Sequence, residues 1–518
     1  MMIIFISQFT HSWVSAIITT ERKSAEFSKT TRIRYPGYHD KIMTAEKAAE
    51  FIKPEMTLGV SGFTIAGYPK AVAGELAKRA RNGEKLELTV YSGASLGEEF
   101  DGELARVGAL KARMPYQTNK DLRNSINAGT ISYHDVPLGQ MPVWVKNNFL
   151  KHIDVAIIEA AAIDENGNII PTTSVGTSNI YAEYADKIII EVNTYVPRCI
   201  EGIHDVYSPE RPPHTQPIPI TKVSDRVGTT YIKCDPAKVV AVVESNIPDN
   251  GRTVSPVDDE FRSMANNLIG FLHSEVEHGR LCNPLPPVQA GVGSVSNAVL
   301  QGLAESDFEH LTVYSEVLQN SIFDLIDAGK VDFASGTSLT ISWDKRDEFF
   351  ENFEKYRDKM ILRPQEISNH PEVIRRLGVI AINTVIEADI YGNTNSSYID
   401  GCRLMNGVGG SGDYCENAGL SIFITKSTAK DGMLSCIVPQ VSHVDHTIHE
   451  IHALITEQGV ADLRGLDPVE RANLIIDKCA HPKFRKALHE YLDNAESTCK
   501  YKENPVDMQA ALNFEKAM

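Results

Sequence analysis

The chain repeats itself, and this repetition constrains the possible fold more than any other feature of the sequence. Three pairs of segments match in the same order along the chain: 88–92 with 311–315, 158–168 with 386–393, and 175–185 with 408–418. Both members of the first pair read Leu-Thr-Val-Tyr-Ser. Continuous β-branched runs such as 187–192 are typical of parallel strands covered on both faces. We therefore expect two similar, internally duplicated α/β domains, each an open and mostly parallel sheet.

The two copies differ in the residue that follows the shared strand. The first copy continues with Gly93 and the second with Glu316. In an open parallel sheet, ligands bind beyond the carboxyl ends of the strands, so Glu316 is a candidate catalytic carboxylate. A structural alternative exists, because an acid at a helix N-terminus is stabilising by about 0.3–1 kcal/mol. The divergence from Gly93 favours the catalytic interpretation.

Composition excludes several classes of function. A chain of 518 residues is too long for one core, and its 42% apolar and 23% charged residues are ordinary for a globular enzyme. The formal net charge of −17 leaves no basic footprint for nucleic acid or an anionic membrane, so we expect neither as a partner. Eight cysteines without a CxxC pair argue against a zinc ribbon or a disulfide scaffold and favour a reducing, cytoplasmic location.

Two segments indicate boundaries. Residues 1–30 lack the positive charge that precedes the apolar run of a secretory signal, so a mis-called start is favoured over an organellar leader. Residues 205–225 contain five prolines and little periodicity, which favours an interdomain crossing. This divides the chain into an N-terminal domain at 31–225 and a C-terminal domain at 226–518. The second copy would open with the strand Val239–Val243 and end in a helical tail that begins near Pro468.

Two glycine-rich loops lie in the second copy. Gly291-Val292-Gly293 precedes a predicted helix at 297–303, and such a loop presents free N–H groups to an oxyanion or a phosphate. A plain tight turn is an equally good interpretation. Residues 407–412 formally match GxGxxG, but they lie too far into the chain to open a dinucleotide-binding unit. Their glycines still permit close approach of a ligand to the backbone.

Four histidines form an HxxHxxHxxH series at His443, His446, His449 and His452. On a helix, histidines three residues apart share a face, so a zinc site has to be considered. Four such residues drift around the helix, however, and no cysteine pair accompanies them. A hydrogen-bonded or solvated histidine patch is favoured, and no metal is expected.

Several longer segments together resemble the class I coenzyme A transferases. The match is to the branch that contains succinyl-CoA:acetate CoA-transferases, propionyl-CoA:succinate CoA-transferases and acetyl-CoA hydrolases. It extends from about residue 32 to beyond residue 490. The segments that carry it are SGFTIAGYPKAV (61–72), MPYQT (114–118), GVGSVSNAVLQGL (291–303), YSEVLQNSIFDL (314–325), LRPQEISNHPEVIRRLGVIAIN (362–383), LMNGVGGSGDY (404–414) and ITEQGVADLRGL (455–466).

The resemblance implies a site between the two domains and assigns roles within it. Glu316 would be the nucleophile, and the backbone N–H groups of Val292 and Gly410 would be the oxyanion donors. Asn369 and Glu457 fall on positions that line the family's active site. Coenzyme A would be held by Gly291, Val292, Gly293, Ser294, Val295, Asn406, Gly410 and Lys430. Ser294 departs from the asparagine that is common in relatives, but a serine can still donate a hydrogen bond.

The implied reaction moves CoA between succinyl-CoA and acetate through a covalent glutamyl-CoA thioester, in a ping-pong cycle. Propionyl-CoA:succinate transfer and acetyl-CoA hydrolysis remain alternatives, and a catalytically silent CoA-binding regulator is disfavoured by the intact Glu316. The CoA thioester is a substrate, and no tightly bound cofactor is expected. The other implied partners are small carboxylates (acetate, succinate, propionate) and a second copy of the chain in a homodimer. The candidates for the wall of the acyl pocket are Arg113, Tyr116, Gln117 and Thr118.

Overall fold

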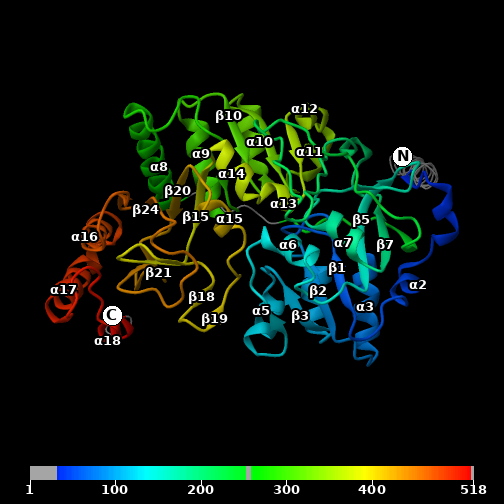
Figure 1. Ribbon diagram of the computed structural model, residues 1–518, viewed down its shortest axis with the longest axis horizontal. Helices are drawn as coiled ribbons and strands as arrows, with labels where there is room; N and C mark the ends of the chain where they lie inside the picture. The colour runs from blue at the N-terminus through cyan, green and yellow to red at the C-terminus, as the bar shows by residue number, and fades with distance from the viewer. Residues whose placement is uncertain (1–31, 252–257, 515–518) are drawn as a thin grey trace, which may run out of the picture.

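The computed structural model describes residues 32–251 and 258–514, which form two α/β domains side by side (Figure 1). Each domain contains one large and mostly parallel sheet. The expected fold class is therefore confirmed. The prediction for residues 1–30 lies outside the described residues. Among the described helices, none is long and apolar enough to cross a membrane.

The N-terminal sheet has the strand order β4-β3-β2-β1-β5-β7-β8, and β6 pairs antiparallel with β5. Its strands are β1 (Thr57–Val60), β2 (Leu88–Ser92), β3 (Leu110–Met114), β4 (Ser132–Tyr133), β5 (Val155–Ile163), β6 (Ile169–Pro171), β7 (Lys187–Asn193) and β8 (Val239–Ser245). Its helices are α2 (Ala45–Ala49), α3 (Ala71–Arg81), α4 (Glu103–Arg106), α5 (Lys120–Asn127), α6 (Gln140–Lys146) and α7 (Ser178–Tyr184). Alternate residues of β5 enter two separate cores, because Ile157 packs with α3 whereas Ile158 packs with α7. Both faces of the sheet are thus covered, as the continuous apolar strands predict.

The C-terminal sheet has the order β14-β12-β10-β9-β15-β20-β24-β25, in which only β25 is antiparallel to its neighbour among the described strands. Its strands are β9 (Val288–Ala290), β10 (Leu311–Tyr314), β12 (Val331–Gly336), β14 (Met360–Leu362), β15 (Ile380–Thr384), β20 (Leu420–Ile424), β24 (Ala453–Thr456) and β25 (Gly459–Asp462). The helices of this domain ahead of the tail are α8 (Asp259–Glu277), α9 (Ser294–Glu305), α10 (Asn320–Asp327), α11 (Arg346–Glu351), α12 (Glu354–Arg357), α13 (Gln365–Ser368), α14 (Pro371–Leu377) and α15 (Ser411–Cys415). Shorter strands are β11 (Val317–Gln319), β13 (Ser338–Thr340), β16 (Glu387–Asp389), β17 (Thr394–Asn395), β18 (Tyr398–Ile399), β19 (Arg403–Leu404), β21 (Thr428–Ala429), β22 (Leu434–Ser435) and β23 (Ile437–Val438).

The two strand orders correspond position by position, so the duplication seen in the sequence is also present in the fold. The repeated Leu-Thr-Val-Tyr-Ser segments form β2 and β10, and each is the third strand of its sheet. By the same correspondence β8 matches β24, the seventh strand of the other sheet. Glu316 and Gly93 consequently occupy equivalent places in the two domains.

The expected boundary at residue 225 is wrong for one strand. β8 pairs in parallel with β7 over six residue pairs from Ile188–Val239 to Asn193–Ser245, so it completes the first sheet and does not open the second. Strand pairing depends on position in space, and a strand that follows a long crossing can still return to the earlier sheet. The first domain therefore includes residues 239–245.

The proline-rich segment 205–225 reaches the second domain, as expected of a crossing, but the chain then returns. Asp205 forms a buried ion pair with Arg363, and Ile218, Ile220 and Val223 pack beside Tyr314. The segment thus fastens the two domains together before β8 rejoins the first sheet. This contact helps to fix the position of β10 relative to the N-terminal domain.

The C-terminal tail is helical, with α16 (Pro468–Cys479), α17 (Pro482–Thr498) and α18 (Met508–Phe514) lying at one end of the molecule (Figure 1). α16 begins with a capping box in which the Asp467 side chain accepts from the Glu470 N–H and the Glu470 side chain accepts from the Asp467 N–H. Apolar side chains of the tail, among them Ile475 and Leu488, pack on Phe423 and Ile437. The tail covers the outer part of the second domain, far from β10.

A buried ion cluster anchors the loop between β1 and α3. Lys70 lies 2.6 Å from Glu159 and 2.8 Å from Asp249, and its side chain is fully buried. Asp249 also accepts a hydrogen bond from the N–H of Gly67, 3.1 Å away. Because unpaired buried charges are costly, this cluster holds the loop in a single position.

We expect Lys70→Met to lower the free energy of unfolding by about 3–5 kcal/mol, because two buried carboxylates lose their cation. The control is Lys78→Met on the exposed side of α3, where Lys78 pairs with Glu75 and a change within about 0.5 kcal/mol is expected. Urea unfolding followed by circular dichroism measures both. Equal losses in the two variants would contradict the role of the cluster.

Candidate active site

Glu316 stands at the carboxyl end of the central strand β10, where the chain passes into β11. Its carbonyl oxygen accepts hydrogen bonds from the N–H groups of Thr337, at 2.7 Å, and Ser338, at 3.1 Å. The preceding residue, Ser315, donates its hydroxyl to the carbonyl oxygen of Ala290 at 3.0 Å. The backbone at Glu316 is thus fixed on both sides, and only the side chain is free to enter the space between the domains.

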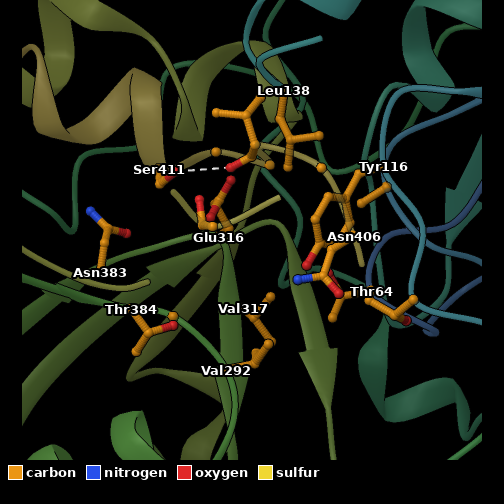
Figure 2. Close-up of a pocket in the computed structure, with 18 of the residues that line it drawn as sticks. Thr64, Tyr116, Leu138, Val292, Glu316, Val317, Asn383, Thr384, Asn406 and Ser411 are labelled. Atoms are coloured by element: carbon orange, nitrogen blue, oxygen red, sulfur yellow. Dashed lines mark hydrogen bonds between the residues drawn. The ribbon is translucent and has the colours of Figure 1, made fainter. Parts of the chain in front are cut away.

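That space is a cavity of about 230 Å³ to which both domains contribute (Figure 2). The N-terminal domain supplies Phe63, Thr64, Ala94, Tyr116, Thr118 and Leu138. The C-terminal domain supplies Gln289, Ala290, Gly291, Val292, Glu316, Val317, Asn383, Thr384, Val385, Ile386, Ser396, Asn406, Gly407, Val408, Gly409, Gly410 and Ser411. Glu316 is the one carboxylate in this lining, which contains no lysine, arginine or histidine among the described residues.

One amide group connects two carboxyl groups at the base of the cavity. Nδ2 of Asn369 donates to Oε1 of Glu316 at 2.7 Å and to Oδ2 of Asp413 at 2.9 Å. Asn369 follows α13 and is fully buried. The N–H of Gly139, from the other domain, also donates to Oδ2 of Asp413, at 2.8 Å. The Glu316 carboxylate is therefore oriented by a network that spans the domain interface.

Burial changes the acidity of both carboxyl groups. Loss of water raises the pKa of Glu316 from 4.5 to about 7, although the hydrogen bond from Asn369 acts in the opposite direction. Burial also raises the pKa of Asp413, to about 8, and the nearby negative charge of Glu316 adds to this shift. Burial thus makes both carboxyl groups harder to ionise than usual, and a negative charge on Glu316 further disfavours ionisation of Asp413.

The backbone of Gly410 packs directly against the Glu316 carboxylate. A Cβ atom at Gly410 would lie 1.7 Å from Oε1 of Glu316, so no other residue fits without displacing the carboxylate. Gly410 is the residue before α15, where backbone N–H groups are free of intrahelical partners. The preceding residues are held by the N-terminal domain, because Asp135 accepts from the N–H of Val408 at 3.0 Å and Leu138 donates to Gly409 O at 3.1 Å.

The other glycine loop approaches the cavity from β9. Gly291 and Val292 line the cavity, and Val292 is 37% exposed. Gly293 has a φ of +109° and precedes α9, which begins at Ser294 rather than at the predicted Asn297. Ser294 and Val295 form the first turn of α9 and do not line the cavity. The helix N-terminus faces the region where an anionic group of a ligand would gain from the helix dipole.

Like Gly293, Ser294, Val295 and Asn369, the predicted residues Glu457 and Lys430 lie outside the cavity lining. Glu457 follows β24 and accepts a hydrogen bond from the N–H of Ser427 at 2.9 Å. Burial alone would raise the pKa of Glu457, but hydrogen bonds from Ser427 and Gln458 hold it below its usual value. Lys430 is exposed between β21 and β22. Their expected roles at the site remain predictions.

Of the four residues predicted for the acyl-pocket wall, two line this cavity and two do not. Tyr116 and Thr118 line the cavity. Arg113 does not, because its guanidinium is buried in an ion pair with Asp101 at 2.9 Å. Gln117 is buried as well and donates to the carbonyl oxygen of Met405 at 3.3 Å. Both contribute to the support behind the cavity.

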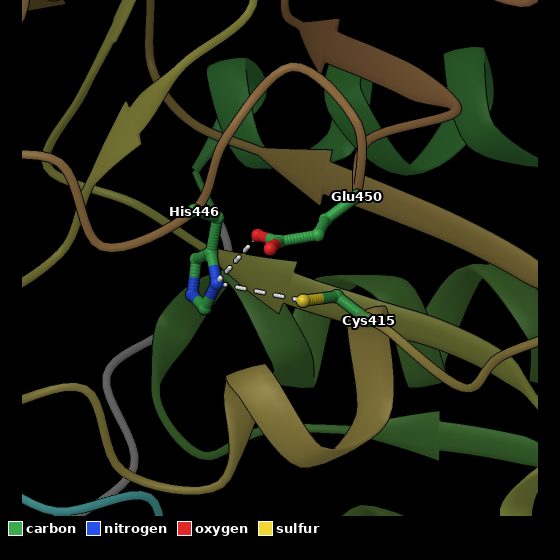
Figure 3. A group of neighbouring side chains, drawn as sticks. All are labelled: Cys415, His446 and Glu450. Carbon is green, nitrogen blue, oxygen red and sulfur yellow. Dashed lines mark hydrogen bonds and ion pairs between the residues drawn. The ribbon is translucent and has the colours of Figure 1, made fainter.

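The four histidines do not share a helical face, because residues 443–452 form a loop without a described helix. His452 accepts a hydrogen bond from the N–H of Ser421 at 3.1 Å, and His443 lies 3.4 Å from Asp445. His449 is exposed. His446 is 1% exposed, and its Nδ1 faces both Cys415 and Glu450 (Figure 3). The zinc arrangement on a helical face is thus not formed.

Asp413 is the residue of this site that sequence reasoning missed. It aligns with Ile180 when the segments 175–185 and 408–418 are compared. A charged residue in one copy opposite an apolar one in the other is the same signal that identified Glu316 opposite Gly93. Comparison of the two copies over their whole length would have found it.

We expect Glu316→Gln to stabilise the protein at pH 8 by about 1–3 kcal/mol. The folded protein binds the Glu316 proton more tightly than the unfolded chain does, so ionisation of this group costs stability as the pH rises from 4.5 to about 7. The gain in the variant should therefore vanish near pH 4.5. Unfolding free energies between pH 4.5 and 8 measure it, with Glu351→Gln on the exposed surface of α11 as the control for removing a charge. A gain that does not change with pH would contradict the assigned pKa.

Comparison with known proteins agrees with this geometry. Residues 27–244 match the acetyl-CoA hydrolase/transferase N-terminal domain, and residues 346–492 match the acetyl-CoA hydrolase/transferase C-terminal domain. Among solved structures, RipA from Yersinia pestis has a TM-score of 0.71 at 24% identity and covers 88% of this chain and 98% of its own. At that identity the likeness concerns the fold alone.

Three relatives are similar along most of the chain. A succinyl-CoA:acetate CoA-transferase from Clostridium kluyveri is 47% identical over 93% of this chain and 90% of its own length. An acetyl-CoA hydrolase from Schizosaccharomyces pombe is 44% identical over 90% of this chain and 92% of its own. A propanoyl-CoA:succinate CoA transferase from Escherichia coli is 44% identical over 88% of this chain and 93% of its own length. Together with a partly buried carboxylate between two matching domains, these likenesses show that the chain is an enzyme of the acetyl-CoA hydrolase/transferase family.

Proposed function

We propose that the protein is a CoA-transferase that exchanges CoA between succinyl-CoA and acetate, with Glu316 as the covalent carrier. The observation that carries this proposal is the position of Glu316, a desolvated carboxylate held by Asn369 against the backbone of Gly410. The likeness to a succinyl-CoA:acetate CoA-transferase supports the choice of acyl pair. Transfer between two carboxylates conserves the thioester bond, so the carrier must itself be a carboxylate.

The cycle begins when an Oε atom of Glu316 attacks the carbonyl carbon of the succinyl thioester. The carbon–sulfur bond breaks, CoA leaves as a thiolate, and a mixed anhydride of Glu316 and succinate remains. The thiolate then attacks the Glu316 carboxyl carbon of the anhydride and expels succinate, which leaves glutamyl-CoA. Acetate reverses both steps, so that acetyl-CoA leaves and the Glu316 carboxylate is restored without net uptake of a proton.

Each tetrahedral intermediate places a negative charge on oxygen, and the backbone N–H groups of Val292 and Gly410 are the proposed donors to it. Both residues line the cavity. Val292 precedes Glu316 in the sequence, and Gly410 follows it. Fixed backbone donors stabilise such a charge without reorganisation, and losing one typically costs about 2.7–4 kcal/mol. Burial raises the pKa of Asp413, which disfavours a second negative charge beside Glu316.

The residues that line the cavity also bear on which acyl groups could bind there. No cationic side chain is present in the described lining, so apart from the Glu316 carboxylate a small monocarboxylate such as acetate meets apolar, hydroxyl and amide groups. The distal carboxylate of succinate would be bound by neutral groups on the N-terminal side, such as the hydroxyls of Thr64, Tyr116 and Thr118. A propionyl group would also fit this lining, which keeps propionyl-CoA:succinate transfer as an alternative.

Hydrolysis is the second candidate, because a relative of 44% identity is an acetyl-CoA hydrolase. Both activities would pass through the same intermediate on Glu316. In hydrolysis water attacks this intermediate, whereas in transfer a carboxylate attacks it. Release of free CoA from succinyl-CoA, measured with and without acetate, succinate or propionate, separates them. We expect formation of acetyl-CoA in proportion to acetate and little free CoA. Free CoA release that is insensitive to every carboxylate would assign the protein as a hydrolase.

We expect Glu316→Ala to lower the exchange of acyl groups between CoA and carboxylates at least about a thousandfold, because no carrier remains. Isotope exchange between labelled acetate and acetyl-CoA measures it, and Glu351→Ala on the surface serves as the control. A variant without Glu316 that retained full exchange would refute the proposed mechanism.

We expect Gly410→Ala to lower kcat about a hundredfold or more, because the new Cβ would displace the carboxylate. Gly412→Ala, two residues further on, provides a matched control. There the nearest atom to the new Cβ is Cε1 of His446, at 3.8 Å, so ordinary contact and near-normal activity are expected. Steady-state kinetics of both variants test the difference, and equal activities would show that the close approach at Gly410 is not required.

A further inference from the structure

We propose that His446 is a positioning residue that aims the Gly410 N–H at the reacting oxygen, through a hydrogen bond to Ser411. This inference rests on the proposed function, since it concerns the donor that the CoA-transfer cycle requires. His446 does not line the cavity, and its effect passes through the loop 408–411.

The loop is held from two sides. On the N-terminal side, Asp135 accepts from the N–H of Val408 and the N–H of Leu138 donates to Gly409 O. On the C-terminal side, the loop is held by the side chain of Ser411, which has two hydrogen-bond partners. Its hydroxyl donates to the carbonyl oxygen of Val408 at 2.8 Å, and its Oγ lies 2.8 Å from Nε2 of His446. Figure 2 shows Ser411 above Glu316, on the segment towards which the carboxylate points. Gly410 lies between these two anchors.

The direction of each hydrogen bond follows from the donors available. The single proton of the Ser411 hydroxyl goes to Val408 O, so the bond to His446 needs a proton on Nε2. The other ring nitrogen, Nδ1, lies 3.4 Å from Sγ of Cys415 and 3.7 Å from Oε2 of Glu450 (Figure 3). Burial raises the pKa of the Cys415 thiol, so this neighbour of Nδ1 stays protonated. Whichever of the two groups Nδ1 contacts, the bond to Ser411 requires a proton on Nε2.

The ring itself cannot move. His446 is 1% exposed, it packs 5.0 Å from the Phe423 ring, and its carbonyl oxygen accepts from the N–H of Thr394 at 2.9 Å. A buried ring on a fixed backbone makes a rigid support for Ser411. Such support matters here because donors to an oxyanion act only when they are aligned before the reaction.

Cys415, His446 and Glu450 also have the residue types of a metal site, and they are the one such group among the described residues. The contact of Nε2 with Ser411 and of Nδ1 with a protonated thiol accounts for the whole ring without an ion. The geometry therefore points to a support for the loop.

Two amide substitutions distinguish this role from general packing. The amide nitrogen of glutamine reaches about as far as Nε2, whereas that of asparagine reaches only about as far as Nδ1. We expect His446→Asn to lower kcat about 10–100-fold with the KM for the acyl-CoA within about twofold, because the donor is misaligned and binding is not. His446→Gln should recover most of the loss. His449→Asn, at an exposed position of the same loop, should leave activity unchanged.

A double-mutant cycle with Ser411→Ala tests whether the two side chains act as a unit. We expect Ser411→Ala alone to resemble His446→Asn, and the double variant to be no worse than either, because each removes the same bond. The inference is overturned if the losses of activity in the double variant are additive, or if His446→Gln is as slow as His446→Asn. It is also overturned if His446→Asn raises KM and leaves kcat unchanged. One zinc ion per chain in the purified protein, lost in both His446 variants, would also overturn it.

The rate of covalent labelling of Glu316 by succinyl-CoA separates this inference from the proposed function. Labelling of the wild type that becomes slow in His446→Asn supports both. Labelling at equal rates in wild type and variant overturns the positioning role alone. If the wild type is never labelled, the proposed carrier fails, and the role of His446 fails with it.

Discussion

The structure depends on one carboxylate that is kept out of water without a cationic partner. Glu316 has a single hydrogen bond from Asn369 and a backbone contact at Gly410, and its pKa rises to about 7 because burial disfavours the charge. A lysine or arginine beside it would stabilise the carboxylate and weaken it as a nucleophile. An amide donor orients the group and leaves it reactive. Burying a carboxylate without a cation lowers the stability of the fold, and other contacts between the domains offset this loss. Among them are the hydrogen bonds of Gly139, Leu138 and Asp135 to loops of the second domain.

The duplicated fold explains how two equivalent strand ends came to serve different purposes. The residue after the shared Leu-Thr-Val-Tyr-Ser segment is Glu316 in the second copy and Gly93 in the first, where an added Cβ would lie 2.7 Å from Gly62 O and 3.0 Å from Oε1 of Gln365. The first strand end is thus packed tightly against the second domain and has no room for a side chain. One copy supplies the carboxylate of the cavity, and the other supplies part of the wall that faces it. The same asymmetry recurs at Asp413 and Ile180, since only the copy that carries the carboxylate needs the polar network.

The fold class and the candidate carboxylate could be predicted from the sequence, because apolar runs and repeated segments can be recognised in the sequence without knowledge of the fold. The repeat predicted two sheets of the same kind, and the contrast between Gly93 and Glu316 predicted a carboxylate that the structure places in the cavity between the domains. The placement of β8 could not be predicted, because a return to the first sheet after a long crossing is decided by which sheet edge remains open. Arg113 was misplaced for a similar reason, since its partner Asp101 lies on a neighbouring segment that only the fold brings near. The histidine series would share a face only on a helix, but residues 443–452 form a loop, and the ring of His446 contacts Ser411, which lies 35 residues earlier.

The central claim is that Glu316 becomes covalently attached to CoA, and trapping that species tests it most directly. The protein would be incubated with succinyl-CoA in the absence of an acceptor and treated with borohydride, which reduces a glutamyl thioester to an alcohol. Peptides would then be mapped by mass spectrometry. The account predicts reduction at Glu316 alone, and its disappearance when excess acetate is added before the borohydride. An unmodified Glu316 alongside steady release of CoA would contradict it.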